Sequence, residues 1–295
     1  MSFPQDAGVL LVAHGTVDNL DDLGAFVARI RHGRPPPPGL VEELRHRYEA
    51  IGGSPLLQTT RQQAAALSKR LEAPVLVGMR LWEPGVERAL AGAVALGLSR
   101  LVVIALAPFS QHVYWEAALK VAQTANSPIR LIPSAPYAQE PDFVAAHAEL
   151  IARHAPPEAP LVLSAHSLPR IAIERGDPYA RLVEAAAQAV SEKVGRPARL
   201  CYQSQGADGG AWLGPDVRET LGALAAEGHG QVAWAPFGFL ADHVETLYDL
   251  DVEAKSIAAE LSLSLVRVPA LNLHPGLTDA LAAVAIRSLS TEASG

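Results

Sequence analysis

The sequence of 295 residues contains a single cysteine, Cys201. One thiol cannot form an internal disulfide or a four-cysteine zinc site, and by itself it cannot hold an iron–sulfur cluster. We therefore expect no iron–sulfur cluster, and this cysteine usage is typical of a reducing cytoplasm. A long hydrophobic run is also missing, since no segment reaches the roughly 18 unbroken apolar residues of a membrane span. The N-terminus lacks the basic and apolar regions of a signal peptide, so the sequence predicts a soluble cytoplasmic protein with no transmembrane segment.

Basic residues are outnumbered by acidic ones, 24 against 31, which gives a net charge of -7. A surface for nucleic acid normally needs clustered Lys and Arg, and the one basic cluster, at residues 29–34, is local. Neither first strand is followed by a glycine-rich phosphate loop, which argues against a nucleotide enzyme. No feature of the sequence specifies the oligomeric state, and we favour a monomer.

Short apolar runs alternate along the chain with longer Ala- and Leu-rich stretches. This pattern is typical of buried parallel strands connected by helical crossovers. The composition, 49% hydrophobic and 19% charged, is that of an ordinary folded enzyme. The sequence therefore predicts an α/β fold with eight strands, at Val9–Ala13, Val75–Gly78, Leu101–Leu106, Ile129–Ile132, Leu161–Ser164, Arg199–Tyr202, Val232–Ala235 and Leu265–Val268.

The two halves of the chain repeat the same short motifs in the same order. Ala13-His14-Gly15 ends the first strand of one half, and Ala165-His166-Ser167 ends the first strand of the other. Ala107-Pro108-Phe109 is likewise matched by Ala235-Pro236-Phe237. This self-similarity predicts two similar α/β domains related by a pseudo-twofold axis, each with a four-stranded parallel sheet flanked by helices.

The position of the domain boundary is indicated by a proline-rich polar stretch at residues 154–160, just before the first strand of the second half. We expect residues 1–155 to form an N-terminal domain and residues 156–295 a C-terminal domain. A second proline run, Pro35–Pro38, is predicted to be a stiff spacer between two helices rather than a domain linker. Open parallel sheets bind ligands at the carboxyl ends of their strands, so His14 and His166 are predicted to point into one cleft between the domains.

Two features of the second half could carry chemistry. His166 follows an apolar strand; taken alone, it is better explained as a hydrogen-bonded loop histidine, but its repetition as His14 favours a functional role. Glu245, Asp249 and Glu253 recur every four residues and would form one acidic ridge on a helix. The ridge is either a solvated acidic face or a path for divalent cations or protons. Imidazole with carboxylate is a ligand set that suits ferrous iron, whereas the lack of thiolates removes softer metals.

Several ordered blocks resemble the ferrochelatases, and together they span nearly the whole chain. The blocks are Ile51–Leu56, Ser164–Pro169 followed by Gly176–Tyr179, Tyr202–Ser204 with Trp212–Pro215, and Asp242–Tyr248. The resemblance implies two Rossmann-like domains with a porphyrin cleft between them. It also implies an enzyme of haem biosynthesis that inserts Fe2+, its substrate, into a porphyrin.

The resemblance also implies roles for individual residues. His166 and Glu245 match the pair that faces the porphyrin centre, holds the metal and takes the pyrrole protons. Asp249 and Glu253 match an outward continuation of the ridge, where a second divalent cation can sit.

The N-terminal region resembles the shorter soluble branch of the family, which acts on coproporphyrin III. The residues at or near the macrocycle contacts of that branch are Arg31, Arg47, Tyr48, Ser54 and Tyr114, and His14 stands where the branch usually has tyrosine. Arginine suits propionates because its planar fork can pair two carboxylate oxygens. Residues 78–82 look more like the protoporphyrin-using members. We therefore favour coproporphyrin III as the substrate, with protoporphyrin IX as the alternative, and whether His14 is an axial ligand stays open.

Two other functions are compatible with the predicted architecture. A chelatase that inserts cobalt or nickel into sirohydrochlorin has a related fold and a similar pair of histidines. A non-catalytic protein that binds haem or a porphyrin would also have a cleft between two like domains, but it would need no acidic ridge.

Overall fold

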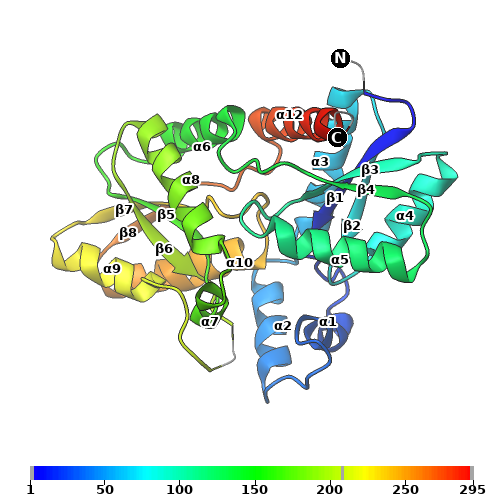
Figure 1. Ribbon diagram of the computed structural model, residues 1–295. Coiled ribbons are helices and arrows are strands. Elements are labelled where there is room, and N and C mark those ends of the chain that lie inside the picture. The colour runs from blue at the N-terminus through cyan, green and yellow to red at the C-terminus, as the bar shows by residue number, and fades with distance from the viewer. Residues whose placement is uncertain (1–2, 207–208, 293–295) are drawn as a thin grey trace. The chain divides into compact units, whose positions relative to one another are not determined.

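The computed structural model describes residues 3–206 and 209–292 (Figure 1). The chain forms two compact units, each built around its own sheet. Unit 1 comprises Met1–Pro36, Pro55–Phe143 and Leu273–Gly295, and unit 2 comprises Pro37–Ser54 and Val144–Asn272.

This division differs from the single boundary predicted after residue 155. The chain changes unit inside the Pro35–Pro38 run, which was expected to lie within one domain, and again near the start of the helix Pro141–His154. The last helix returns to unit 1, where it contacts another helix and two strands of that unit. Apolar periodicity locates a helix and its buried face, but it does not specify which of two similar sheets the helix covers.

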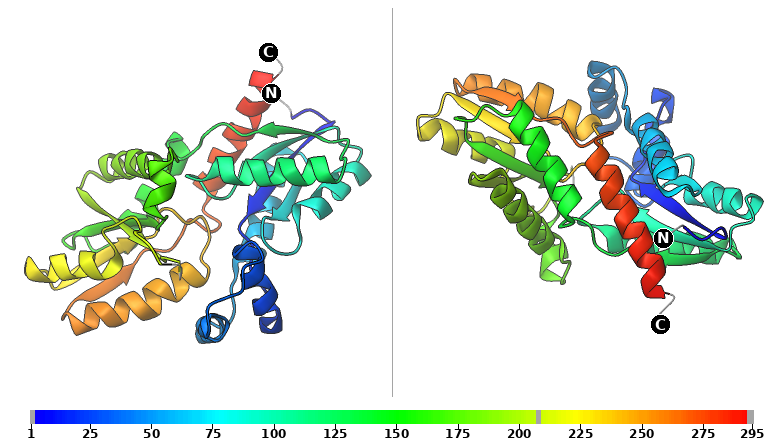
Figure 2. Two further views of the ribbon diagram at one scale, coloured as in Figure 1. Left: turned by 60° about the horizontal axis from the view of Figure 1, so that its bottom comes forward. Right: turned by 90° about the horizontal axis from the view of Figure 1, so that it is seen from above.

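Unit 1 contains a four-stranded sheet in the order β2-β1-β3-β4, with every neighbouring pair parallel. Helices α3 and α12 contact each other and the sheet, and Figure 2 shows α12 in red beside the strands. The elements are β1 (Ala7–Ala13), a 3-10 turn (Leu20–Asp22), α1 (Leu23–Ile30), α3 (Leu56–Leu71), β2 (Val75–Met79), α4 (Val86–Ala95), β3 (Arg100–Ala105), α5 (Gln111–Thr124), β4 (Arg130–Pro133) and α12 (Pro275–Glu292).

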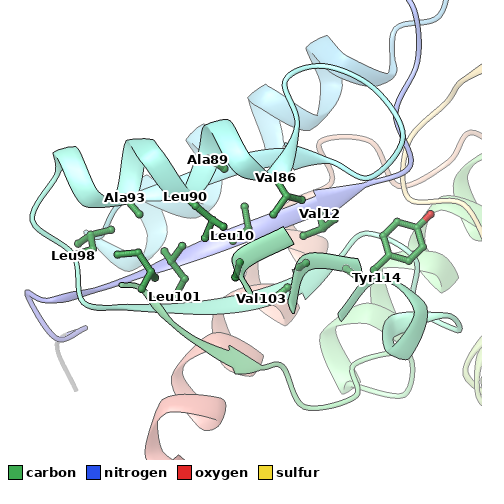
Figure 3. Close-up of a cluster of buried hydrophobic side chains, with 14 residues drawn as sticks. Leu10, Val12, Val86, Ala89, Leu90, Ala93, Leu98, Leu101, Val103 and Tyr114 are labelled. Atoms are coloured by element: carbon green, nitrogen blue, oxygen red, sulfur yellow. The ribbon is translucent and has the colours of Figure 1, made fainter. Parts of the chain in front are cut away.

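The centre of this sheet is buried on both faces. Every residue of β1 is buried, and alternate side chains of a strand point to opposite faces. Leu10 and Val12 pack against Val86 and Leu90 of α4, as Figure 3 shows. A continuous apolar run such as that of β1 is therefore what a central parallel strand requires, because both of its faces are covered by helices.

Unit 2 contains a second four-stranded parallel sheet, in the order β6-β5-β7-β8. Side chains of α9, α11 and an intervening π-helix pack with Val162 and Trp234 in one buried cluster. The elements are α2 (Leu40–Ala50), α6 (Pro141–His154, which begins in unit 1), β5 (Leu161–His166), α7 (Arg170–Glu174), α8 (Tyr179–Val194), β6 (Ala198–Gln203), α9 (Val217–Ala226), β7 (Gln231–Ala235), α10 (Val244–Leu247), the π-helix η2 (Asp249–Ala254), α11 (Lys255–Glu260) and β8 (Ser264–Arg267).

The predicted α/β class and all eight predicted strands are confirmed, with bounds that shift by one or two residues at most ends. Both sheets have the same order, in which the second strand lies at one edge, beside the first, followed by the third and the fourth. This shared order agrees with the sequence repeat. In each sheet the parallel strands end at the same edge, and that edge is where an open α/β sheet binds ligands.

Candidate active site

In unit 2, the structure brings His166 and Glu245 into contact. His166 is the last residue of β5, and Glu245 is the second residue of α10, 79 positions later in the chain. His166 Nδ1 lies 3.1 Å from Glu245 Oε2. The Tyr179 hydroxyl donates to the backbone carbonyl of His166 at 2.8 Å and so fixes the end of the strand. About a third of each side chain is exposed, 35% for His166 and 31% for Glu245, so the pair can still reach a ligand.

A close approach of two backbone segments positions Glu245 beside the sheet. After β7 the chain passes over the end of β5, where the Gly238 N–H donates to the Ser164 carbonyl at 3.1 Å. A Cβ atom on Gly238 would lie 2.8 Å from the Cα of Ala165, which is shorter than real contacts allow. Only glycine fits this crossing, and α10 begins six residues later.

The start of α10 is held by polar contacts to the end of β8. Arg267 donates to the Asp242 carboxylate at 2.8 Å and to the Asp251 carboxylate at 2.7 Å. The Thr246 hydroxyl accepts from the backbone N–H of His243 at 3.0 Å, which caps the first turn. These bonds hold in place the backbone segment that carries Glu245.

The pKa values of the paired residues are shifted in opposite directions. Burial lowers the pKa of His166, but the Glu245 charge and hydrogen bond outweigh burial and raise it above its ordinary value. Burial raises the pKa of Glu245, but His166 and then His243 outweigh burial and hold it well below its usual range. His243 Nε2 lies 3.8 Å from Glu245 Oε2. Glu245 is therefore a carboxylate at neutral pH, and it strengthens His166 as a base.

Asp249 and Glu253 share a cationic partner, Arg47, which comes from α2. Arg47 Nη1 lies 3.0 Å from Asp249 Oδ1, and Nη2 lies 3.3 Å from Glu253 Oε1 and 2.6 Å from Glu43 Oε1. The guanidinium also lies 5.1 Å from the centre of the Tyr248 ring. In the sequence, Lys255 stands at the end of this acidic ridge, whereas Arg47 lies about 200 positions away in the chain.

The acidic ridge does not follow one regular α-helix, as the spacing had predicted. Asp249 and Glu253 lie in the π-helix η2, after α10 has ended at Leu247. The N–H groups of Val252 and Glu253 both donate to the Tyr248 carbonyl at 3.0 Å, which widens the turn by one residue. A π-turn is common at functional sites, and its extra residue is not visible in a charge pattern read with a period of 3.6.

Asp249 is a buried carboxyl group with mixed partners. The Ser204 hydroxyl donates to its Oδ2 at 2.5 Å, and only 7% of the residue is exposed. Burial raises the pKa of Asp249 to about 6, since the charges of Glu245 and Glu253 add to burial while Ser204 and Arg47 oppose it. Asp249 can therefore exchange a proton close to neutral pH.

In unit 1, the structure brings together two of the predicted porphyrin contacts, His14 and Tyr114. His14 follows β1 directly and its Nδ1 lies 3.3 Å from the hydroxyl of Tyr114 on α5. The Arg80 guanidinium lies 5.4 Å from the centre of the Tyr114 ring. These side chains occupy the carboxyl-end edge of the first sheet, as His166 does in the second.

The remaining predicted contacts lie on or beside the first two helices. Arg31 follows α1, and its Nε donates to the Pro35 carbonyl at 3.2 Å. Tyr48 is buried in α2, and its carbonyl accepts from the Gly53 N–H at 2.9 Å. Ser54 lies two residues before α3 begins.

The donor set of the site is small. Within residues 3–206 and 209–292, no three His, Cys, Asp or Glu side chains form a cluster that could hold a metal ion.

The helices within residues 3–206 and 209–292 lack the combination of length and hydrophobicity that a membrane crossing requires.

The ferrochelatase family model matches residues 6–289. The chain belongs to the ferrochelatase family. Enzymes of this family insert iron into a porphyrin. Among its relatives are a ferrochelatase of Thermus thermophilus, 38% identical over 90% of this chain and 93% of the relative, and a coproporphyrin III ferrochelatase of Anoxybacillus flavithermus, 36% identical over 97% of each.

Two solved structures have a similar fold. SirB from Bacillus subtilis with Fe3+ gives a TM-score of 0.63 at 17% identity and covers 98% of each chain. CbiX, the terminal enzyme for siroheme biosynthesis in denitrifying bacteria, gives a TM-score of 0.56, also at 17% identity, and covers 95% of this chain and 98% of its own. At this identity the likeness concerns the fold alone.

Two polar residues at the site had no predicted role, namely Ser204 and His243. Ser204 donates to Asp249, and His243 adds to the charge that holds the pKa of Glu245 low. Both lie inside motif blocks that resemble the family, at residues 202–204 and 242–248. Their position in those blocks could have indicated that they lie at the site. A serine or a histidine by itself does not indicate either role.

The opposing pKa shifts predict how His166 responds when its partner loses its charge. Glu245→Gln removes the carboxylate that raises the pKa of His166 and leaves burial, which lowers it. We therefore expect the NMR titration of the His166 imidazole to move to lower pH in Glu245→Gln. Glu227→Gln is the matched control, because Glu227 pairs with Arg199 instead. An unchanged His166 titration in Glu245→Gln would show that the two groups are not coupled.

Proposed function

We propose that this enzyme inserts Fe2+ into coproporphyrin III, as a step of haem biosynthesis, with His166 and Glu245 as the protein groups at the metal. The observation that carries this proposal is the contact of 3.1 Å between the imidazole and the carboxylate at the ligand-binding edge of the second sheet. Imidazole nitrogen and carboxylate oxygen together suit a divalent first-row metal such as Fe2+.

Iron insertion requires a base as well as a metal ligand. When Fe2+ binds the four nitrogens of a porphyrin, two pyrrole N–H bonds break and two protons leave. A neutral His166 can accept one of these protons, and Glu245 favours the protonated imidazole by its charge; the other proton can pass to the Asp249 carboxylate or to water. Because the pKa of His166 is raised, we expect activity to rise with pH through a value above that of an ordinary histidine. Two protein donors also leave the other positions around the iron open for pyrrole nitrogens.

Asp249 and Glu253 are proposed to continue the site outward from Glu245. Their carboxylates would form a path along which protons leave or iron arrives. Asp249 contributes because its pKa of about 6 allows proton exchange near neutral pH. Both carboxylates are bound to Arg47 in this structure. A second divalent cation at the ridge would therefore compete with the Arg47 guanidinium for the same oxygens.

Coproporphyrin III is supported as the substrate by the names of several relatives at 33–36% identity. Its propionates call for cationic partners. We propose Arg31 and Arg47 as propionate partners, and Arg47 would exchange contacts with its three carboxylates for a propionate. His14, Tyr48, Ser54 and Tyr114 are proposed as further macrocycle contacts.

Protoporphyrin IX is the second candidate substrate. It is favoured by His14, which stands where the coproporphyrin branch usually has tyrosine.

Replacing His166 tests the proposed reaction. His166→Ala should leave coproporphyrin binding measurable by fluorescence quenching but lower the rate of iron insertion at least about 100-fold, because the metal ligand and base is removed. His229→Ala is the control, since His229 is a partly exposed histidine that lies near Glu227. Near-normal insertion by His166→Ala would contradict the assignment.

Parallel assays distinguish the two candidate substrates. Insertion of Fe2+ into coproporphyrin III and into protoporphyrin IX, followed by the metalloporphyrin absorption bands, should give a higher kcat/KM for coproporphyrin III. A strong preference for protoporphyrin IX would overturn the substrate proposal and leave the reaction class unchanged. No metalloporphyrin from either substrate would favour a binding protein.

A further inference from the structure

Gln203 is a buried polar residue that contacts the backbone at both members of the His166–Glu245 pair. It is the last residue of β6, pairs with His166 in the sheet, and is only 1% exposed. Its carbonyl accepts from the Ser167 N–H at 2.7 Å, next to His166. Its side-chain Nε2 donates to the Glu245 carbonyl at 2.7 Å. One residue thus ties the end of β5 to the first turn of α10.

The orientation of the Gln203 amide follows from a buried chain of hydrogen bonds. Trp234 Nε1 can only donate, and it donates to the Ser164 hydroxyl oxygen at 2.9 Å. The Ser164 hydroxyl then donates its own hydrogen to Gln203 Oε1 at 2.6 Å. At the other end, the Glu245 carbonyl can only accept, so the NH2 group of Gln203 must face it. Each group in this chain of hydrogen bonds therefore has a defined role as donor or acceptor in each bond.

The same amide reaches toward the second acidic residue. Gln203 Nε2 lies 3.4 Å from the Ser204 hydroxyl oxygen, and that hydroxyl donates to Asp249 at 2.5 Å. A donor facing the Ser204 oxygen favours the rotamer in which the Ser204 hydrogen points at Asp249. The contacts of one amide therefore extend to Glu245 and, through Ser204, to Asp249.

We infer that Gln203 is a positioning residue for iron insertion, which Ser164 orients from behind and which holds Glu245 in reach of His166. This inference rests on the proposed function. Ser164 is fully buried, and among the interactions of the described residues its side chain has no direct hydrogen bond to His166 or Glu245, so its influence on the pair passes through Gln203. A displacement of about 1 Å at a reacting group can cost roughly 100-fold in rate.

Four variants test this role. Gln203→Met keeps the length of the side chain but removes the donor to Glu245. Ser164→Ala removes the group that orients the amide, and Gln203→Met/Ser164→Ala combines the two. Trp234→Phe is the matched control, because it removes one buried hydrogen bond of the same chain but leaves the Ser164 hydroxyl able to donate to Gln203. For each variant, kcat, KM for Fe2+, coproporphyrin III affinity and Tm are measured with the whole protein.

We expect Gln203→Met to lower kcat/KM for Fe2+ about 100-fold while its coproporphyrin affinity stays within about twofold of the wild type. Ser164→Ala should lose about 10-fold. The combined variant should be no worse than Gln203→Met alone, since Ser164 acts through Gln203. Trp234→Phe should lower Tm but stay within about threefold in activity.

Three results would overturn the inference: Gln203→Met with wild-type kcat/KM, losses that multiply in the combined variant, or equal activity losses in Trp234→Phe and Gln203→Met. If Gln203→Met does not fold, a wild-type rate in Ser164→Ala would contradict the inference, and a loss larger than that of Trp234→Phe would support it. A wild-type protein that inserts no iron would instead remove the proposed function itself.

Discussion

The contact between His166 and Glu245 is the interaction on which the proposed function of this protein depends. It joins the end of a central strand to the start of a short helix, and residues of β6, of β8 and of the segment after β7 help to hold the two ends in place. Gly238 permits the close crossing, and Arg267 and Gln203 secure the segment that carries Glu245. The chemistry follows from this placement, because a carboxylate kept ionised beside a histidine makes that histidine a stronger base.

Much of the fold could be predicted from the sequence, because a buried parallel strand has a simple signature. The apolar run of β1 and the repeated Ala-His motif located the centre of each sheet and its ligand-binding edge. The unit in which each helix packs could not be predicted in the same way. Helix α12 follows the second sheet in the sequence but packs in unit 1, and α2 belongs to unit 2. Such choices depend on shape complementarity between distant surfaces, which a local pattern does not contain.

The candidate site also has features that the sequence could predict and features that it could not. His166 and Glu245 could be proposed from their motifs, and the structure brings them together. The partner of Asp249 and Glu253 could not, since Arg47 reaches them only in the folded chain. The π-turn was also hidden, because the charge spacing fits a regular helix equally well. The role inferred for Gln203 depends on the direction of several hydrogen bonds, which only atomic coordinates define.

Contact between Fe2+ and His166 is the central claim of the proposed function. X-ray absorption spectra of the anaerobic protein loaded with Fe2+ would answer it by comparing the wild type with His166→Ala. The account predicts that the multiple-scattering signature of an imidazole ligand is present in the wild type and lost in His166→Ala. The same imidazole signature in both proteins would contradict it.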